Sequence, residues 1–403
     1  MSAIRLLRWR MPDGRIRLGI DAGAGRAVPV DEELAGVDSV DTLQRSCRAM
    51  GMSVAEWAAV ALDEHRGTEE VPAASCVAPV NLSELWASGV TYEMSRDARE
   101  AETSSALNLY AKVYGAERPE LFFKAPGNRV VGPNDFVGLR RDAVWHVPEP
   151  ELTAVLDDRG HVFGYTLGND MTARDLEAEN PLYLPQTKMF HHGASIGPAI
   201  VLAGTINPYD LTITLEIQRR GKRILSQSTS TRRITRHVEE LVDYLARAWP
   251  LAPWTGLMTG TGIVPPDEFA LEDGDEILIT VPEIGTLRNV ARPIEPSWAD
   301  VPPGRPRVLR IDSRDNVAIA LGALHRGERI TVDGRAIVVR DDIPFGHKVA
   351  LEEMPQGHWV IKYGERIGIA SQSIHQGQHV HTQNLESQRG RGDLLRQDGG
   401  QRE

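Results

Sequence analysis

The sequence predicts a mainly β protein with some helix, of the α+β class, built from more than one domain. With 403 residues the chain is too long for a single hydrophobic core. Short alternating or β-branched runs, separated by glycine, proline and asparagine turns, recur along most of it. Helical spacing of apolar residues is clearest in two stretches, 39–65 and 236–249.

Composition narrows the class of protein. Hydrophobic residues make up 41% and charged residues 25% of the chain, as in an ordinary soluble protein. The net charge of −11 argues against a nucleic-acid-binding surface. Two cysteines, Cys47 and Cys76, are too few for a disulfide framework, which fits a reducing compartment. The sequence has neither a run of about 20 apolar residues nor a secretory signal. We therefore expect a cytoplasmic protein that does not associate with a membrane.

The first 78 residues are expected to form a small β-hairpin and helix region. Residues 4–9 and 15–20 are strand-like, and Pro12-Asp13-Gly14 between them is a turn, because proline presets φ and glycine accepts positive φ. The helical stretch 39–65 follows. No chemistry is assigned to this region.

An acidic stretch, residues 148–198, organises the rest of the chain. Glu149 and Glu151 are one residue apart, so on a strand they would share a face, about 6–7 Å apart. A second strand-like run, 162–167, leads to Asp170. Three carboxylates from neighbouring strands suit Mg²⁺, and Mn²⁺ accepts the same oxygen ligands. The alternative is that the two glutamates line a solvated edge strand and that Asp170 lies in an ordinary turn.

Two further groups of residues carry possible chemistry. Gln186 and Lys188 come directly after a proline-containing loop, and a lysine beside a cation loses proton affinity and could serve as an acid or base. Later, the loop Thr259-Gly260-Thr261 is glycine-rich, so its backbone N–H groups could approach an anion. Lys124, in the strand-like run 121–126, is expected to be structural rather than catalytic.

The order and spacing of these motifs carry a resemblance. The motifs are the Glu149-x-Glu151 pair, Gly-Tyr-Thr-Leu-Gly-Asn-Asp-Met-Thr-Ala-Arg-Asp at 164–175, Lys188, Gly197-Pro198, Thr-Gly-Thr-Gly at 259–262 and Gly-Thr-Leu-Arg-Asn at 285–289. Over roughly residues 80–293 the chain resembles the fumarylacetoacetate hydrolase family. The resemblance implies a mixed β-sandwich/roll catalytic domain over 79–293 and a homodimer. It also implies a divalent metal on Glu149, Glu151 and Asp170, a substrate role for Lys188, and a carboxylate cradle at 259–261.

One segment indicates a branch of that family. Gly-Val-Thr-Tyr-Glu-Met-Ser-Arg occupies 89–96, and the hydrolytic branch carries a histidine three residues after the tyrosine, where this sequence has Ser95. A serine is no general base near neutral pH. The pattern is similar to the 2-keto-3-deoxy-arabinonate dehydratase branch, which implies substrate contacts from Tyr92, Ser95 and Arg96. The alternative is that Ser95 and Arg96 cap a following helix.

The chain changes character after residue 293. Residues 294–306 contain four prolines and predict a semi-rigid linker. Residues 307–385 consist of short strands split by glycine turns and resemble the SAF (β-clip) domain of altronate and galactarate dehydratases. Those enzymes usually have histidines where Asp312 and Gln383 stand here. His379 and His381 could still bind a metal or a sugar-acid oxygen, although partner docking is the alternative. The polar tail, 386–403, predicts disorder.

The function expected from these features is a Mg²⁺-dependent lyase that dehydrates a small-molecule 2-keto-3-deoxy sugar acid. The metal would stabilise an enolate, and Lys188, assisted by Gln186 or a metal-bound water, would transfer the proton. Two alternatives stay open. One is a hydrolase or decarboxylase of an acylpyruvate-like diketo acid, whose substrates chelate the metal identically. The other is a sugar-acid-binding or partner-docking protein that acts through its C-terminal module.

Overall fold

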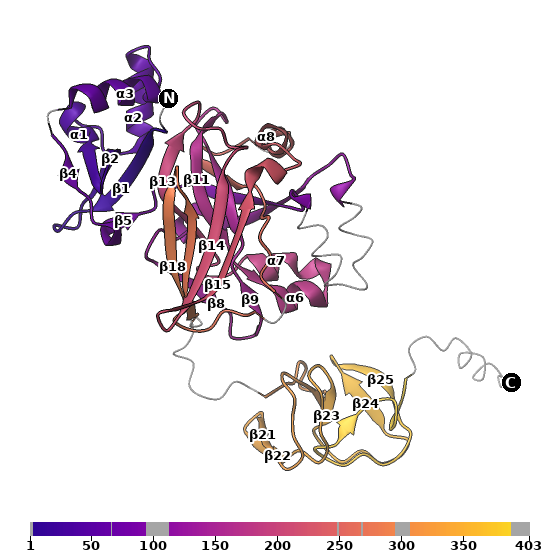
Figure 1. Ribbon diagram of the computed structural model, residues 1–403. Helices are drawn as coiled ribbons and strands as arrows, with labels where there is room; N and C mark the ends of the chain where they lie inside the picture. The colour runs from indigo at the N-terminus through magenta and orange to yellow at the C-terminus, as the bar shows by residue number, and fades with distance from the viewer. Residues whose placement is uncertain are drawn as a thin grey trace. The chain divides into compact units, whose positions relative to one another are not determined.

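The computed structural model describes residues 3–65, 67–93, 113–247, 250–266, 269–294 and 307–387. The chain divides into two compact units, Met1–Ile294 and Glu295–Glu403 (Figure 1). Strands dominate both units, so the predicted mainly β class with some helix is confirmed. Most of the predicted linker and of the predicted tail lies outside the described residues.

The first unit is built on an eleven-stranded sheet of order β4-β3-β2-β1-β13-β11-β10-β16-β6-β7, with β5 paired to β1. The strands are β1 (Arg5–Arg10), β2 (Ile16–Gly23), β3 (Arg26–Pro29), β4 (Glu69–Glu70), β5 (Cys76–Val77), β6 (Glu84–Gly89), β7 (Glu120–Pro126), β10 (Pro150–Leu156), β11 (Val162–Asp170), β13 (Ala194–Leu202) and β16 (Thr255–Met258). The N-terminal hairpin β1–β2 joins this sheet because β1 pairs with β13, Leu6 opposite Ile200. Residues from 1–78 and from 79–293 therefore share one sheet.

A second sheet packs against the central strands of the first. Its order is β15-β14-β17-β18-β8. The strands are β8 (Phe136–Leu139), β14 (Thr212–Arg219), β15 (Lys222–Ser230), β17 (Glu276–Val281) and β18 (Gly285–Pro293). Alternate residues such as Ile213, Leu215 and Ile279 are fully buried and share a core with Leu152 and Leu167 of the first sheet. Side chains that alternate in this way bury one face of each sheet, which gives the predicted sandwich.

Short helices and strands connect the sheets. They are α1 (Val30–Glu33), η1 (Ala73–Ser75), η2 (Gly127–Arg129), β9 (His146–Val147), β12 (Thr172–Ala173), α6 (Arg174–Glu179), η3 (Pro181–Tyr183), α7 (Leu184–Lys188), η4 (Thr231–Arg233) and α8 (Val238–Ala246). Four of them, β12, α6, η3 and α7, follow β11 in the chain. They carry the sequence from Asp170 to Lys188.

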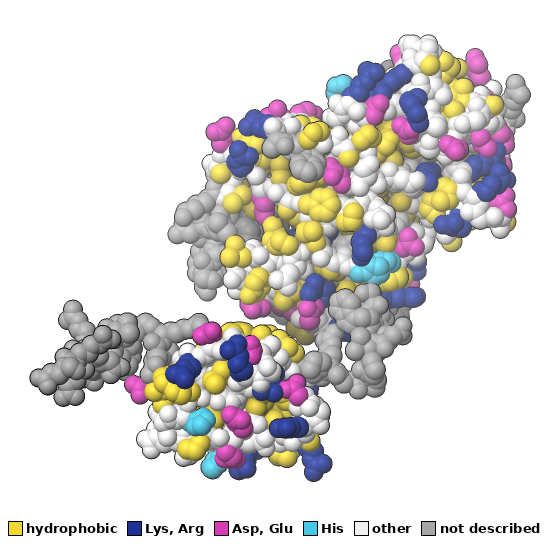
Figure 2. Space-filling model, turned by 180° about the vertical axis from the view of Figure 1, so that it is seen from behind, with side chains coloured by type: hydrophobic (Ala, Val, Ile, Leu, Met, Phe, Trp, Pro, Cys, Tyr) yellow, Lys and Arg dark blue, Asp and Glu magenta, His cyan; other side chains and the backbone are white. Residues whose placement is uncertain are grey.

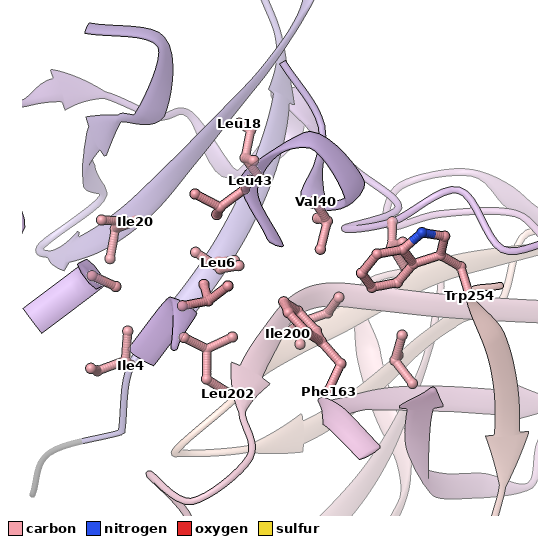
Figure 3. Close-up of a cluster of buried hydrophobic side chains, with 14 of the residues drawn as sticks. Ile4, Leu6, Leu18, Ile20, Val40, Leu43, Phe163, Ile200, Leu202 and Trp254 are labelled. Carbon is pink, nitrogen blue, oxygen red and sulfur yellow. The ribbon is translucent and has the colours of Figure 1, made fainter. Parts of the chain in front are cut away.

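The helical stretch predicted over 39–65 is two helices, α2 (Val40–Ala49) and α3 (Val54–Glu64). Each begins with a serine capping box, at Ser39 and at Ser53, and Gly51 between them has φ +74°. Because the second cap satisfies a new set of helix N–H groups, the chain restarts there instead of continuing. Figure 3 shows Val40 and Leu43 of α2 over Leu6 and Ile20 of the hairpin.

Asp157, in the turn between β10 and β11, links that turn to helix α2 by hydrogen bonds. Its carboxylate accepts hydrogen bonds from the Gln44 amide (2.8 Å), the Arg48 guanidinium (2.6 Å) and the backbone N–H groups of Arg159 (2.8 Å) and His161 (3.0 Å). Burial alone would raise the pKa of Asp157, but these hydrogen bonds outweigh it and the pKa lies below its ordinary value.

We expect Asp157→Asn to lower the free energy of unfolding at pH 7 by about 1–3 kcal/mol, the range for hydrogen bonds to a charged group. Because the folded pKa is depressed, the ionised carboxylate stabilises the fold above the unfolded pKa of 3.8, and that contribution is lost as pH falls through the folded pKa. Urea unfolding from pH 7 to about pH 3 measures the difference. The control Asp158→Asn removes an exposed ion pair with Arg48 and should cost about 0–1 kcal/mol. An Asp157→Asn deficit that is independent of pH would contradict this account.

The second unit is all β, as predicted. Its strands are β19 (Val308–Leu309), β20 (Val317–Ala320), β21 (Arg329–Val332), β22 (Arg335–Val338), β23 (Lys348–Ala350), β24 (Trp359–Lys362), β25 (Glu365–Ala370), β26 (His379–Val380) and β27 (Leu385–Ser387). They form sheets of order β19-β20-β23-β26, β21-β22 and β24-β25-β27. Two small cores, around Val349 and around Val360, hold the unit together.

A seven-residue pattern leads into four strands of the second unit, β21, β23, β24 and β26. In each copy, an apolar residue is followed by a glycine three positions later and by a second apolar residue three positions after that. The copies occupy 324–330, 343–349, 354–360 and 374–380. All four glycines have positive φ, which glycine adopts without strain. Leu324 pairs with Ile343 and Met354 with Ile374 in isolated bridges. Residues at the same place in different copies are equivalent. His347 and His358 are such a pair, because each directly follows the glycine of its copy.

The surface carries charges of both signs. Figure 2 shows lysine and arginine side chains interspersed with aspartate and glutamate on one face of the molecule. Several form ion pairs, among them Arg17 with Asp31 and Arg247 with Asp243. Exposed pairs contribute only about 0–1 kcal/mol each, so the cores account for most of the stability. Within the described ranges, no helix has the length and apolar character needed to cross a membrane.

Candidate metal centre

The three predicted carboxylates meet at one end of the β10–β11 pair. Glu149 directly precedes β10, and Asp170 is the last residue of β11. The Asp170 backbone N–H donates to the Glu149 carbonyl (3.0 Å), so the two residues lie opposite each other. One carboxylate oxygen from each of Glu149, Glu151 and Asp170 lies within 4.8 Å of the other two, and all three residues are about 1% exposed.

Buried cationic side chains surround this triad. Lys188, at the end of α7, donates from Nζ to Glu149 (2.5 Å), to Asp170 (3.2 Å) and to the Thr172 hydroxyl (2.6 Å). Lys124, on β7, forms an ion pair with Asp170 and donates to the carbonyl of Lys188 (2.5 Å). The Arg174 guanidinium lies 3.2 Å from Glu149. Lys124 thus fixes the backbone that carries Lys188.

The electrostatic environment of Glu151 favours the binding of a cation. Burial raises the pKa of this carboxyl well above its ordinary value, and the charges of Asp170 and Glu149 raise it further, against the opposing charge of Lys188. A bound divalent ion would offset these effects and favour the ionised form. Three buried, hard oxygen donors are the ligand set of Mg²⁺ or Mn²⁺, so the residues present fit such an ion.

The triad lines a small pocket. Its lining residues are Ser88, Gly89, Val90, Glu120, Phe122, Glu149, Glu151, Asp170, Glu177, Leu184, Lys188 and Thr261. Glu120 and Glu177 were missed by the sequence analysis. A Cβ atom on Gly89 would lie 2.1 Å from the Glu120 carboxylate, so the glycine at this position lets the carboxylate approach. Nothing in the local sequence signals that Glu120, at the start of β7, lines the same pocket as the triad.

The predicted carboxylate cradle lies beside the triad. The Gly260 N–H donates to the Glu151 carboxylate (2.6 Å), and the Thr259 hydroxyl donates to the Leu152 carbonyl (2.9 Å). Gly260 has φ +86°, and a Cβ there would lie 2.0 Å from the Thr91 hydroxyl. In the structure, therefore, the Gly260 amide holds a carboxylate of the protein, and Thr261 is the loop residue that lines the pocket.

Of the other predicted site residues that the structure describes, none is among the residues that line the pocket. Gln186 is exposed and does not line the pocket, because residues two apart on the helix α7 point in different directions. Tyr92 is fully buried; burial raises the pKa of its phenol, and the nearby charge of Glu151 raises it further. Ser95 and Arg96 lie outside the described residues. His379 and His381 belong to the second unit.

Family models match both parts of the chain. Residues 96–292 match the model described as "Fumarylacetoacetate (FAA) hydrolase C-terminal". Residues 306–388 match the model described as "Altronate/galactarate dehydratase SAF domain". The second match covers the four-fold repeat and the histidines at 379 and 381.

Curated relatives and solved structures agree with the first match. The chain is 46% identical over 212 residues to "Probable 2-keto-3-deoxyxylonate dehydratase" of Haloferax volcanii, covering 52% of this chain and 73% of that protein. It is 46% identical over 213 residues to "2-dehydro-3-deoxy-D-arabinonate dehydratase" of Saccharolobus solfataricus, covering 52% and 72%. The structure titled "2-keto-3-deoxy-D-arabinonate dehydratase complexed with magnesium and 2,5-dioxopentanoate" has a TM-score of 0.55 at 32% identity, covering 73% of this chain and all of that one.

The second unit has relatives of its own. Altronate dehydratase of Bacillus subtilis is 42% identical over 79 residues, which are 20% of this chain and 16% of that protein. Because so little of that enzyme is matched, the likeness concerns the small all-β domain alone.

Proposed function

Because this chain belongs to the fumarylacetoacetate hydrolase family, we propose that it is a divalent-metal-dependent lyase that removes water from a 2-keto-3-deoxy sugar acid. The observation that carries the proposal is the buried triad of Glu149, Glu151 and Asp170 in one pocket with Lys188. Two relatives at 46% identity are named as dehydratases of such acids, and a related structure is titled as a complex with magnesium.

The triad would hold Mg²⁺ or Mn²⁺, which supplies Lewis-acid stabilisation of negative charge on the oxygens of a 2-keto acid. Lys188 is the residue that would move the proton at C3. Its Nζ faces the pocket and is held by the Thr172 hydroxyl as well as by carboxylates. With Glu149 and Asp170 neutralised by a cation, Thr172 would still orient the amine. The backbone of Lys188 is fixed in turn by Lys124.

Elimination of water also needs a proton for the departing C4 hydroxyl. Glu120 lines the same pocket and is not one of the three triad carboxylates. We assign Glu120 this proton-donor role. Thr261 would contact the substrate carboxylate, and the Gly260 amide would serve the site indirectly by holding Glu151.

A ¹H NMR time course with Mg²⁺ tests the proposal. The protein is incubated in turn with 2-keto-3-deoxy-pentonates, with 2-keto-3-deoxy-hexonates and with acylpyruvates. We expect a sugar acid to lose one molecule of water, with a new aldehyde proton if it is a pentonate and a second ketone if it is a hexonate. No turnover is expected after chelation. Release of pyruvate and a free carboxylic acid from an acylpyruvate, without sugar-acid turnover, would overturn the dehydratase assignment and identify a hydrolase.

A further inference from the structure

Three histidines of the second unit, His347, His379 and His381, lie together and form a histidine trio. Strands β23 and β26 are antiparallel, with Val349 opposite His379 and Lys348 opposite Val380. Continuing that register places His347 opposite His381, and His379 lies two residues from His381 on the same side. The ring centroids are 4.8 to 5.5 Å apart. Sequence alone indicated His379 and His381; the pairing of β23 with β26 adds His347.

Two of these rings are already in direct contact. Nδ1 of His347 lies 2.8 Å from Nε2 of His379, which is a hydrogen bond between imidazoles. Two nitrogens bound to one Zn²⁺ at about 2.0–2.1 Å are separated by about 2.9–3.4 Å. A small widening would therefore replace the shared proton by a metal ion. His381, whose ring stacks on that of His347, would supply a third nitrogen after rotation of its side chain.

Neighbouring side chains hold the backbone of the histidine trio in place. The side chain of Asn384 accepts from the His381 N–H (3.0 Å) and donates to the His379 carbonyl (2.8 Å), so one amide fixes the backbone of both residues. The Asp341 carboxylate accepts from the His379 N–H (3.0 Å). Such contacts hold ligand residues in place before a metal binds.

We propose that the histidine trio binds a late first-row divalent transition metal, with Zn²⁺ as the resident ion. Imidazole nitrogen suits Zn²⁺, Co²⁺ and Ni²⁺, whereas Mg²⁺ prefers oxygen. The site is chemically distinct from the carboxylate triad of the first unit. It would give the second unit a bound ion of its own, independent of the cation that serves the dehydration.

Titration of the full chain with Co²⁺, in a large excess of Mg²⁺, tests this site. Nitrogen ligands in a four- or five-coordinate site give Co²⁺ strong visible absorption, whereas Co²⁺ in an octahedral oxygen site absorbs weakly. We expect one strongly absorbing Co²⁺ per chain, displaced by Zn²⁺ but not by Mg²⁺. His347→Ala and His379→Ala should each weaken its binding at least about 100-fold.

His358→Ala is the matched control, because His358 occupies the position of His347 in another copy of the repeat and is exposed. It should leave the absorption unchanged. His347→Gln, compared by thermal unfolding with the unaltered chain, guards against loss of the fold. Absence of the strong absorption, or its persistence in both His347→Ala and His379→Ala, would overturn the proposal. The Co²⁺ absorption does not depend on dehydratase activity. The metal site can therefore be tested even if the protein turns out not to be a dehydratase.

Discussion

Replacing Glu151 with glutamine is expected to lower Mg²⁺-dependent kcat/KM by about 10³-fold or more. The change keeps the shape of the side chain and an oxygen for the Gly260 N–H, but it removes one of three charges that would hold the cation. Steady-state kinetics over a Mg²⁺ series measures the loss. Glu179→Gln, an exposed carboxylate on α6, is the matched control and should keep full activity. Full turnover by Glu151→Gln after rigorous chelation would refute the metal-dependent mechanism.

Thermal unfolding gives the same substitution a second readout. In the unaltered protein Mg²⁺ should raise the midpoint of unfolding, because an ion that binds only the folded state stabilises it by mass action. In Glu151→Gln that rise should largely disappear. Without metal, the variant should be at least as stable as the unaltered protein, because burial and two neighbouring carboxylates destabilise the ionised form of Glu151.

Lys188→Met is expected to abolish turnover and to destabilise the metal-free protein by about 3–5 kcal/mol. The substitution leaves Glu149 and Asp170 without the ammonium group they share, in a site where both are about 1% exposed. Added Mg²⁺ should restore part of the stability, because it supplies positive charge, but none of the activity, because it cannot move the C3 proton. Urea unfolding with and without Mg²⁺, beside an activity assay, separates the two effects.

Gln186→Ala is the control for Lys188→Met. The side chain is exposed and lies outside the pocket, so kcat/KM should stay within about twofold. A large loss in Gln186→Ala would show that Gln186 reaches the substrate after all. Recovery of activity in Lys188→Met at saturating Mg²⁺ would exclude Lys188 as the proton-transfer residue.

The metal ligands could be predicted because they depend on local geometry. Glu149 and Glu151 are separated by one period of a strand, and Asp170 comes from the next strand, its direct neighbour. The position of Lys188 after the acidic residues indicates an acid or base, and the resemblance of its motif adds the substrate role. Gln186 was paired with Lys188 on proximity in sequence alone, and the short helix α7 directs the two side chains differently. A short helix with a proline in its first turn is easily taken for a loop.

The residues that the sequence did not reveal come from long-range pairing. Glu120 lines the pocket, and Lys124 forms an ion pair with Asp170, because β7 pairs with β6, whose other neighbour is β16, at the edge of the large sheet. No local pattern specifies which strands become neighbours across more than a hundred residues. The same reason explains why a hairpin was predicted for the first residues but not its attachment to β13. His347 likewise joined His379 and His381 only through strand pairing.

The junction between β1 and β13 has a consequence for the integrity of the sheet. Without β1, the backbone N–H and C=O groups of β13 around Ala199–Val201 would form an open, largely apolar edge. Exposed edges of that kind recruit strands from other molecules and lead to aggregation. By pairing with this edge, the N-terminal hairpin therefore protects the sheet from self-association, although it contributes no residue to the pocket.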